Sequence, residues 1–297
     1  MKEIIYITKQ STKIKRKDNQ IAVYENREKI WSFPINRIDK VFVFGNIEIS
    51  MPAVNFLLSR NVDIYLLSFN GKFKGLITNT NLGSNYSLRL KQYRAFSDEN
   101  KSLQTAKFFV LEKINAVEEY TGEDFSYYKK ALELSDSYNE ILGIEGGVSN
   151  IFFQNFRERL KDDSLGFTKR EYRPAPDPVN ALLSLIYSMF YSLLFSFLSA
   201  KGFDPYISFL HKKRGTHASL SSDFMEIFRV KLSDFVLFLF NRGIFSKDDF
   251  ISSESSYYLK EESLKKFVDL FHQNFITDRK YSKLFEEKVN DFVGILS

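Results

Sequence analysis

The sequence predicts an α+β protein in which an N-terminal domain of β-strands precedes a larger, all-α C-terminal domain. Residues 1–80 hold short β-branched and aromatic segments separated by polar breaks, a pattern typical of strands. Past residue 85, apolar residues recur at three- and four-residue intervals, a pattern typical of helices. We therefore expect a β-rich domain at 1–80, a linker at 81–90 and a helical domain at 91–297.

The first domain is expected to contain closely spaced strands and one short helix at 53–61. Asp18-Asn19 and Asn70-Gly71 each predict a tight turn between two successive strands. The predicted strands are 4–8, 13–17, 20–25, 29–35, 41–45, 62–69 and 72–78.

The second domain is expected to be helical except for loops near 161–178, 201–218 and 243–255. The clearest helical spacing is at 87–96, 103–120, 127–142 and 220–240.

Residues 179–200 form an uncharged run that is long enough to cross a bilayer. Serines recur every four residues from Ser184 to Ser196, which lines one helical face with small hydroxyl groups suited to close packing. A lone span flanked by RPAPDP and KGFDP would be unusual, so a buried core helix is favoured over a membrane span. Because the chain starts with the charged segment MKEIIYITKQ, we expect no secretion and a cytoplasmic protein.

The composition excludes one class of chemistry and indicates a class of partner. The sequence has no cysteine, which excludes disulfides, zinc-thiolate sites and thiol nucleophiles. Lys plus Arg number 42 against 37 Asp plus Glu, a net charge of +5 that leans mildly toward polyanionic partners.

The segment SFLHKKRGTHASLSSDFMEIF, residues 208–228, brings histidine, basic and acidic residues together. Asp223 and Glu226 are three apart near the start of the predicted helix, so both carboxylates share one face. Two carboxylates there would also simply offset the helix dipole, with Glu226 paired to Arg229. With His211 just before them, one imidazole and carboxylate oxygens would suit Mn²⁺ or Mg²⁺ better than zinc. The spacing alone supports two interpretations of this segment equally, a metal site and a solvated basic loop.

Three basic residues follow His211 directly: Lys212, Lys213 and Arg214. They would attract phosphate groups. A third metal ligand must come from elsewhere, and the best candidate is Glu145 in ILGIEGGVSNIFF, where neighbouring glycines at a helix start would let a ligand approach closely. The alternative for Glu145 is a capping acid at a helix break.

Four sequence blocks, in this order, resemble one known family. They are GIEGGVSNIFFQNF, YRPAPDPVNALLSLIYSMFYSLL, GFDPYISFLH and SLSSDFMEIFR. Together they look like the motifs of the CRISPR-associated endonuclease that integrates new spacers, the first-numbered Cas protein, over about residues 85–230. The β-rich start agrees with that family's N-terminal domain.

The resemblance implies that the metal ligands are Glu145, His211 and Glu226, with Asp223 as a supporting acidic group close to the metal. Ser208 stands where the family usually has glycine, and Ala175 replaces a proline. His217 occupies a loop that is commonly Pro/Gly-rich, and we expect it to lie on that loop rather than at the metal. His272 is expected at the surface.

The resemblance also implies attack on a DNA phosphodiester, by water or by the 3′-hydroxyl of another strand, with Mg²⁺ or Mn²⁺ as cofactor. Lys212, Lys213 and Arg214 would hold the DNA backbone in line. Joining both ends of a short duplex to a repeat needs two active sites, which favours a homodimer through the N-terminal domain, and the family adds the small second-numbered Cas protein as a bridge. The alternative is a non-catalytic DNA-binding scaffold with a structural metal site.

Overall fold

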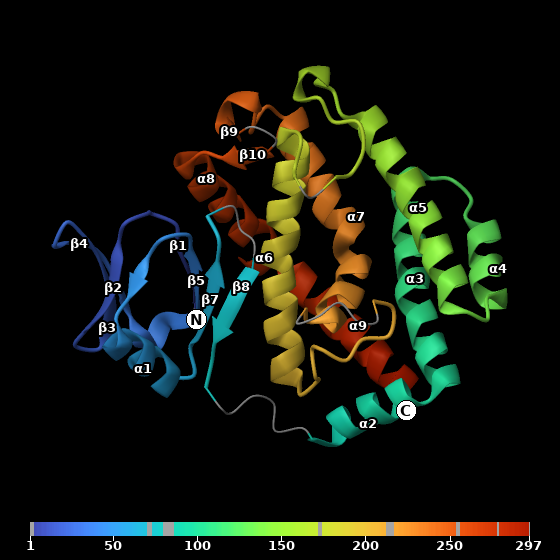
Figure 1. Cartoon of the computed structure of the whole chain (residues 1–297), viewed down its shortest axis with the longest axis horizontal. Coiled ribbons are helices and arrows are strands. Elements are labelled where there is room, and N and C mark those ends of the chain that lie inside the picture. Colours follow the sequence, from blue (N-terminus) through green and yellow to red (C-terminus); the bar gives the residue numbers. More distant parts are fainter. Residues whose placement is uncertain are drawn as a thin grey trace. The chain divides into compact units, whose positions relative to one another are not determined.

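The computed structural model describes residues 3–69, 73–79, 86–171, 174–211, 217–253, 256–277 and 279–296. Its contacts divide the chain into two units (Figure 1). The first unit comprises residues 1–82 with 259–270, and the second comprises 83–258 with 271–297. The predicted fold class is confirmed, because a strand-rich N-terminal region precedes a helical one.

The first unit contains two four-stranded sheets and helix α1 (Met51–Ser59). In one sheet the order is β1-β5-β7-β8, with the first three strands parallel and β8 antiparallel to β7. In the other the order is β4-β3-β2-β6, with antiparallel hairpins and a parallel β2–β6 pair. The bounds are β1 Glu3–Ile7, β2 Lys13–Lys17, β3 Gln20–Glu25, β4 Glu28–Pro34, β5 Ile38–Phe44, β6 Glu48–Ile49, β7 Asp63–Leu67 and β8 Phe73–Ile77.

Strand alternation explains how the first sheet is buried. Ile5, Val41 and Ile64 belong to one apolar cluster that α1 completes through Phe56. Neighbouring residues point to the opposite face, where Phe42 stacks between Tyr6 and Tyr65 with ring centroids 5.2 and 4.6 Å away. Both faces of the central strand β5 are therefore buried.

The two predicted turns have different outcomes. Asp18 lies at the β2–β3 hairpin with a left-handed φ of 54°, as an Asp in a tight turn tolerates, so that turn is confirmed. Asn70-Gly71 lies outside the described residues, although β7 and β8 do pair antiparallel.

The second unit is built mainly of helices. Helix α8 (Glu261–Phe271) comes late in the chain, but most of it is grouped with the first unit. Helix α3 shows how the sequence sets the bounds: Asp98 accepts a hydrogen bond from the Lys101 N–H at 3.0 Å, and Gly122 ends the helix at φ 75°. The helices are α2 Tyr86–Ser97, α3 Glu99–Thr121, α4 Ser126–Leu134, α5 Tyr138–Arg159, α6 Pro178–Lys201, α7 Ser219–Asn241 and α9 Arg279–Leu296.

The structure differs from two of the sequence predictions. The helix expected at 127–142 is two helices, because Ser135 is extended and Ser137 caps α5. The loop expected at 243–255 contains strand β9 (Phe250–Ser253), which pairs with β10 (Ser256–Leu259) where a helix was expected. Helix α2 begins at Tyr86, in agreement with the helical spacing at 87–96, and residues 80–85 lie outside the described residues.

Helix α6 is long and apolar enough to cross a membrane by length and composition. However, 78% of its most apolar 18-residue window is buried inside the protein, as in a core helix. Asp177 caps the helix by accepting the Asn180 N–H at 2.7 Å, and Gly202 ends it at φ 99°. The predicted burial of this segment is confirmed.

Helices α3, α5 and α7 pack against one another, and α6 packs on α7 (Figure 1). Glu145 of α5 and Glu226 of α7, two of the carboxylates singled out in the sequence, both contact α3 at the place where α3, α5 and α7 meet.

Candidate active site

Helix α7 carries three charged side chains on one face: Asp223, Glu226 and Arg229. The Asp223 and Glu226 side chains are only 0% and 2% exposed. Neither Ser219 nor Ser222 caps the helix, since its start has no side-chain cap. Charges buried to this degree need partners, and each has them.

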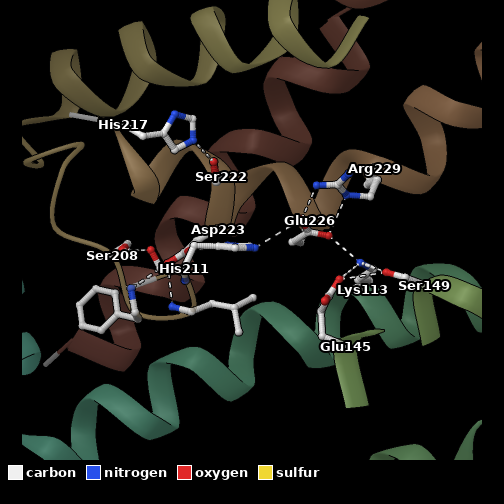
Figure 2. A network of polar contacts seen from close by, with 12 residues as sticks. Lys113, Glu145, Ser149, Ser208, His211, His217, Ser222, Asp223, Glu226 and Arg229 are labelled. Atoms are coloured by element: carbon white, nitrogen blue, oxygen red, sulfur yellow. Dashed lines mark hydrogen bonds and ion pairs between the residues drawn. The ribbon is translucent and has the colours of Figure 1, made fainter. Parts of the chain in front are cut away.

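Asp223 fixes the segment that carries His211 (Figure 2). Its Oδ2 accepts the backbone N–H groups of Phe209 at 2.7 Å and Leu210 at 3.0 Å. Its Oδ1 accepts the His211 N–H and lies 2.9 Å from the His211 Nδ1. With all these acceptor positions used, Asp223 orients the imidazole rather than facing the cluster around Glu226.

The imidazole in turn presents its other nitrogen to Glu226. His211 Nε2 lies 3.9 Å from Glu226 Oε1. Because Asp223 holds Nδ1, the neutral ring keeps its lone pair on Nε2, the arrangement seen in histidines that ligate metals.

Lys113 of α3 links the two predicted carboxylate ligands. Its side chain is 1% exposed, and its ammonium donates to Glu226 Oε2 at 2.7 Å, to Ser149 Oγ at 2.6 Å and to Glu145 Oε1. Ser149 also donates to Glu145 Oε1 at 2.9 Å. Glu145 and Glu226 are therefore neighbours across one ammonium (Figure 2).

Glu145 lies inside α5 and not at a helix start, so both sequence interpretations of its local structure are wrong. Gly143 and Gly146 are helical, and a methyl group added to either would meet no atom within 4 Å. The glycines do not serve a turn here. They leave the helix surface beside Glu145 open.

Sequence reasoning missed Lys113, although a signal was present. The buried positions of α3 recur at helical spacing, and Lys113 occupies one of them among Phe109, Val110 and Val117. A lysine inside an apolar stripe is rarely buried without a charged partner.

Arg229 holds Glu226 from another side. Its Nε donates to Glu226 Oε2 at 2.8 Å and its Nη2 donates to Oε1. The guanidinium lies over the Tyr187 ring, 4.9 Å from the centroid. The predicted pairing of Glu226 with Arg229 is thus present alongside the contacts to His211 and Lys113.

The local charges shift two pKa values in opposite directions. Burial lowers the pKa of His211, but the hydrogen bond to Asp223 and the charges of Asp223 and Glu226 outweigh it, so the pKa is raised. Burial raises the pKa of Glu226, but the cations of Arg229, Lys113 and His211 bring it well below its usual range. Glu226 is ionised at any physiological pH.

The other predicted residues are His217, His272 and three basic residues after His211. Lys212, Lys213 and Arg214 lie outside the described residues. His217 is exposed, stacks on Tyr191 with ring centroids 4.8 Å apart and contacts Ser222 Oγ at 2.7 Å, turned away from Glu226 (Figure 2). His272 is half-buried.

The donor types fit a divalent cation, although Lys113 now faces them. Among the described residues, no three His, Asp or Glu side chains are grouped so as to hold a metal ion by themselves. The reason is visible at Glu145 and Glu226, whose oxygens face an ammonium. His211 Nε2 and Glu226 Oε1 lie 3.9 Å apart, so this nitrogen and this oxygen are close enough that both would hold one divalent cation.

The family model and the similar proteins of known name agree on one family. The family model described as CRISPR associated protein Cas1 matches residues 5–273. A CRISPR-associated endonuclease Cas1 of Thermodesulfovibrio yellowstonii is 31% identical, covering 91% of this chain and 90% of that protein.

Solved structures show the same fold. A Cas1 protein from Thermotoga maritima has a TM-score of 0.89 at 22% identity, covering 99% of this chain and 97% of that one. A casposase bound to integration product has a TM-score of 0.86 at 22% identity, covering 100% and 90%. A Cas6-RT-Cas1–Cas2 complex has a TM-score of 0.85 at 20% identity, covering 99% of this chain and 35% of that one.

Proposed function

This chain belongs to the Cas1 family of CRISPR-associated proteins, and we propose that Glu145, His211 and Glu226 hold the divalent cation with which it cuts and joins DNA. It is a DNA endonuclease and integrase of CRISPR adaptation, which inserts short DNA segments into a repeat array by phosphodiester transesterification. We infer Mg²⁺ or Mn²⁺ as the cation, because one imidazole nitrogen and carboxylate oxygens suit these ions.

One observation carries the assignment of ligands. Glu145 and Glu226 contact the same ammonium, and the other oxygen of Glu226 faces His211 Nε2 at 3.9 Å. Three side chains from α5, from α7 and from the segment before α7 thus converge, although 81 positions separate Glu145 from Glu226 in the chain (226 − 145 = 81). Such convergence is what a site for one cation requires.

Each residue has a distinct part in the proposed chemistry. A bound divalent cation supplies polarisation of the phosphoryl oxygen and stabilisation of the leaving oxyanion. His211 offers the Nε2 lone pair because Asp223 fixes its Nδ1 side. Glu226 is held in place by Arg229, and Glu145, at 19% exposed the more accessible carboxylate, would be the one nearer to a DNA phosphate.

The partners follow from the same family. We propose that the chain binds DNA and assembles with Cas2, because one similar solved structure is a casposase bound to integration product and another is a Cas6-RT-Cas1–Cas2 complex. Lys212, Lys213 and Arg214 would hold the phosphate backbone. A homodimer would supply the two active sites that joining both DNA ends requires. The protein would act in the cytoplasm, where the CRISPR array lies.

The test is strand transfer of a short duplex into repeat DNA. Glu145→Ala, His211→Ala and Glu226→Ala should each abolish transfer while leaving much of the DNA binding, measured by gel shift. Glu158→Ala, an exposed acid on the same helix α5, is the matched control and should transfer normally. Wild-type transfer by all three variants would contradict the ligand assignment. Metal-dependent cleavage of branched DNA by the wild type separates this function from that of a non-catalytic scaffold.

A crystal soaked in Mn²⁺ gives a direct reading of the same assignment. The anomalous signal should lie between Glu145, His211 and Glu226. A signal elsewhere, with none at these side chains, would overturn it.

A further inference from the structure

We propose that Lys113 is the resident counter-ion of the metal-ligating carboxylates: its ammonium holds the cation position in the metal-free protein, and a divalent cation must displace it. The inference rests on the proposed metal site and adds a competing cation from the chain itself. Lys113 is thereby a positioning residue, which sets how tightly the cation binds.

The first step is the burial of Lys113. Its side chain is 1% exposed within a stripe of α3 that otherwise packs Phe109, Ile114 and Val117 into the core. A buried ammonium is stable only when it is paired and hydrogen-bonded. An ammonium has three N–H donors, and Lys113 has three acceptors, on Glu145, Ser149 and Glu226. Its site is complete without any further partner.

The second step is that these acceptors are the proposed metal ligands. Glu145 and Glu226 each present a carboxylate oxygen to Lys113 Nζ. A dication bound by the same two carboxylates would lie within a few ångströms of that ammonium, where like charges repel strongly in a poorly solvated site. The two cations are therefore alternatives, and the measured metal affinity is reduced by the free energy needed to release Lys113.

The third step is that Arg229 does not share this role. It donates to Glu226 through Nε and Nη2 and rests on Tyr187, so its hydrogen bonds to a carboxylate go to Glu226 and not to Glu145. Arg229 thus pairs directly with Glu226 and acts on Glu145 only through its charge at longer range, whereas Lys113 contacts both carboxylates. Among the residues that the structure describes, Lys113 is the cation that contacts both Glu145 and Glu226.

The consequence is a protein that stays folded without metal and binds it less tightly than its donors would allow. Without the ammonium, the negative charges of the two carboxylates should be less well neutralised in the metal-free state. Both carboxylates should then be available to a metal. The metal-free protein should then lose stability while its affinity for metal rises.

The experiment is calorimetric titration of Mn²⁺ into the full chain, comparing wild type with Lys113→Met and Lys113→Gln. Both variants remove the charge, and glutamine keeps an N–H₂ donor for the carboxylates should the methionine variant fold poorly. We expect Mn²⁺ to bind about tenfold more tightly to each, equivalent to about 1.4 kcal/mol. Mn²⁺ should also raise the melting temperature of each variant more than that of wild type.

The matched control is Lys107→Met, which removes the same charge from α3 where the ammonium donates to the Glu133 carbonyl oxygen. It should bind Mn²⁺ like wild type. Unchanged or weaker Mn²⁺ binding by both Lys113 variants would overturn the inference, because it would show that the lysine supports the ligands instead of competing with the metal. If wild type binds no Mn²⁺, or binds it equally after His211→Ala and Glu226→Ala, the proposed metal site itself fails.

Discussion

Asp223 holds His211 at two points, through the backbone N–H and through Nδ1, both 2.9 Å from the same oxygen Oδ1. Its other oxygen binds the two preceding N–H groups of Phe209 and Leu210. The acid that the sequence placed beside the metal is therefore the anchor of the histidine segment. Its influence on a metal passes through the orientation of the ring.

The first prediction concerns Asp223→Asn. An amide has one acceptor oxygen in place of two and cannot satisfy the same N–H groups, so the imidazole should lose its fixed orientation. Loss of such an outer partner typically weakens metal binding about 10- to 100-fold. Calorimetric titration with Mn²⁺ measures this, and Asp234→Asn, an exposed position on the same helix, is the control. Unchanged affinity in Asp223→Asn would show that the anchor is dispensable.

The second prediction is a pH dependence from His211. Its raised pKa means that the protonated ring stabilises the folded protein. That contribution is complete below the unfolded value of about 6.5 and is lost as the pH rises through the folded pKa. The metal-free wild type should thus lose stability through this window, while Mn²⁺ binding strengthens because the ligand must be neutral. Urea denaturation and Mn²⁺ titration at several pH values test both slopes.

His211→Gln provides the comparison for these slopes. It should flatten the loss of stability in that window, whereas His217→Gln, which changes a histidine outside the cluster, should keep it. A wild-type slope retained in His211→Gln would assign the titration to another group.

The sequence was sufficient for those parts of the site that depend on local spacing. Asp223 and Glu226 share a face of α7 because three residues make nearly one helical turn, and the apolar residues Phe209 and Leu210 just before His211 are buried. The core helix α6 followed from the uncharged run and its serines in the same way.

Long-range contacts set the limits of that reasoning. Lys113 becomes part of the site only because α3 packs on both α5 and α7, and no spacing within α3 reveals that packing. Glu145 was expected at a helix start because glycines disfavour helices, but tertiary packing overrides this weak preference over the length of α5. The paired strands β9 and β10 were not predicted, because the serine-rich sequence in which they lie lacks a strong turn signal.

The third prediction is an asymmetry between the two carboxylates in stability. Glu226 is 2% exposed and is bound by both Lys113 and Arg229, so Glu226→Gln removes the carboxylate that pairs with Arg229 and one of the two that pair with Lys113. Breaking a buried pair in this way costs about 3–5 kcal/mol. Glu145 is 19% exposed, and after Glu145→Gln the ammonium of Lys113 still has Glu226, so the loss should be about 1 kcal/mol.

Urea denaturation of the metal-free variants checks this ordering. Both variants should lose strand transfer, so activity alone would not distinguish them. Equal free energies of unfolding for the two variants would contradict the contacts that Lys113 and Arg229 make.

Asn180 belongs to a sequence block that has no chemical role in the site, and its hydrogen bonds give that block a structural role. Its Oδ1 accepts the Glu171 N–H at 2.8 Å and Arg170 Nη1 at 2.9 Å. Its amide nitrogen donates to the Lys169 carbonyl oxygen at 2.9 Å and to Asp177 Oδ2 at 2.6 Å. The D-P-x-N segment therefore ties the preceding loop to the capped start of α6.

The fourth prediction follows from that arrangement. Asn180 is fully buried, so Asn180→Ala removes several hydrogen bonds at once and leaves backbone groups of the loop without partners. We expect the free energy of unfolding to fall by about 3 kcal/mol, against little change for Asn115→Ala, an exposed position on α3. Mn²⁺ affinity of the folded protein should stay at the wild-type value, because α6 carries none of the proposed ligands. A variant of wild-type stability with weakened Mn²⁺ binding would instead link this segment to the metal.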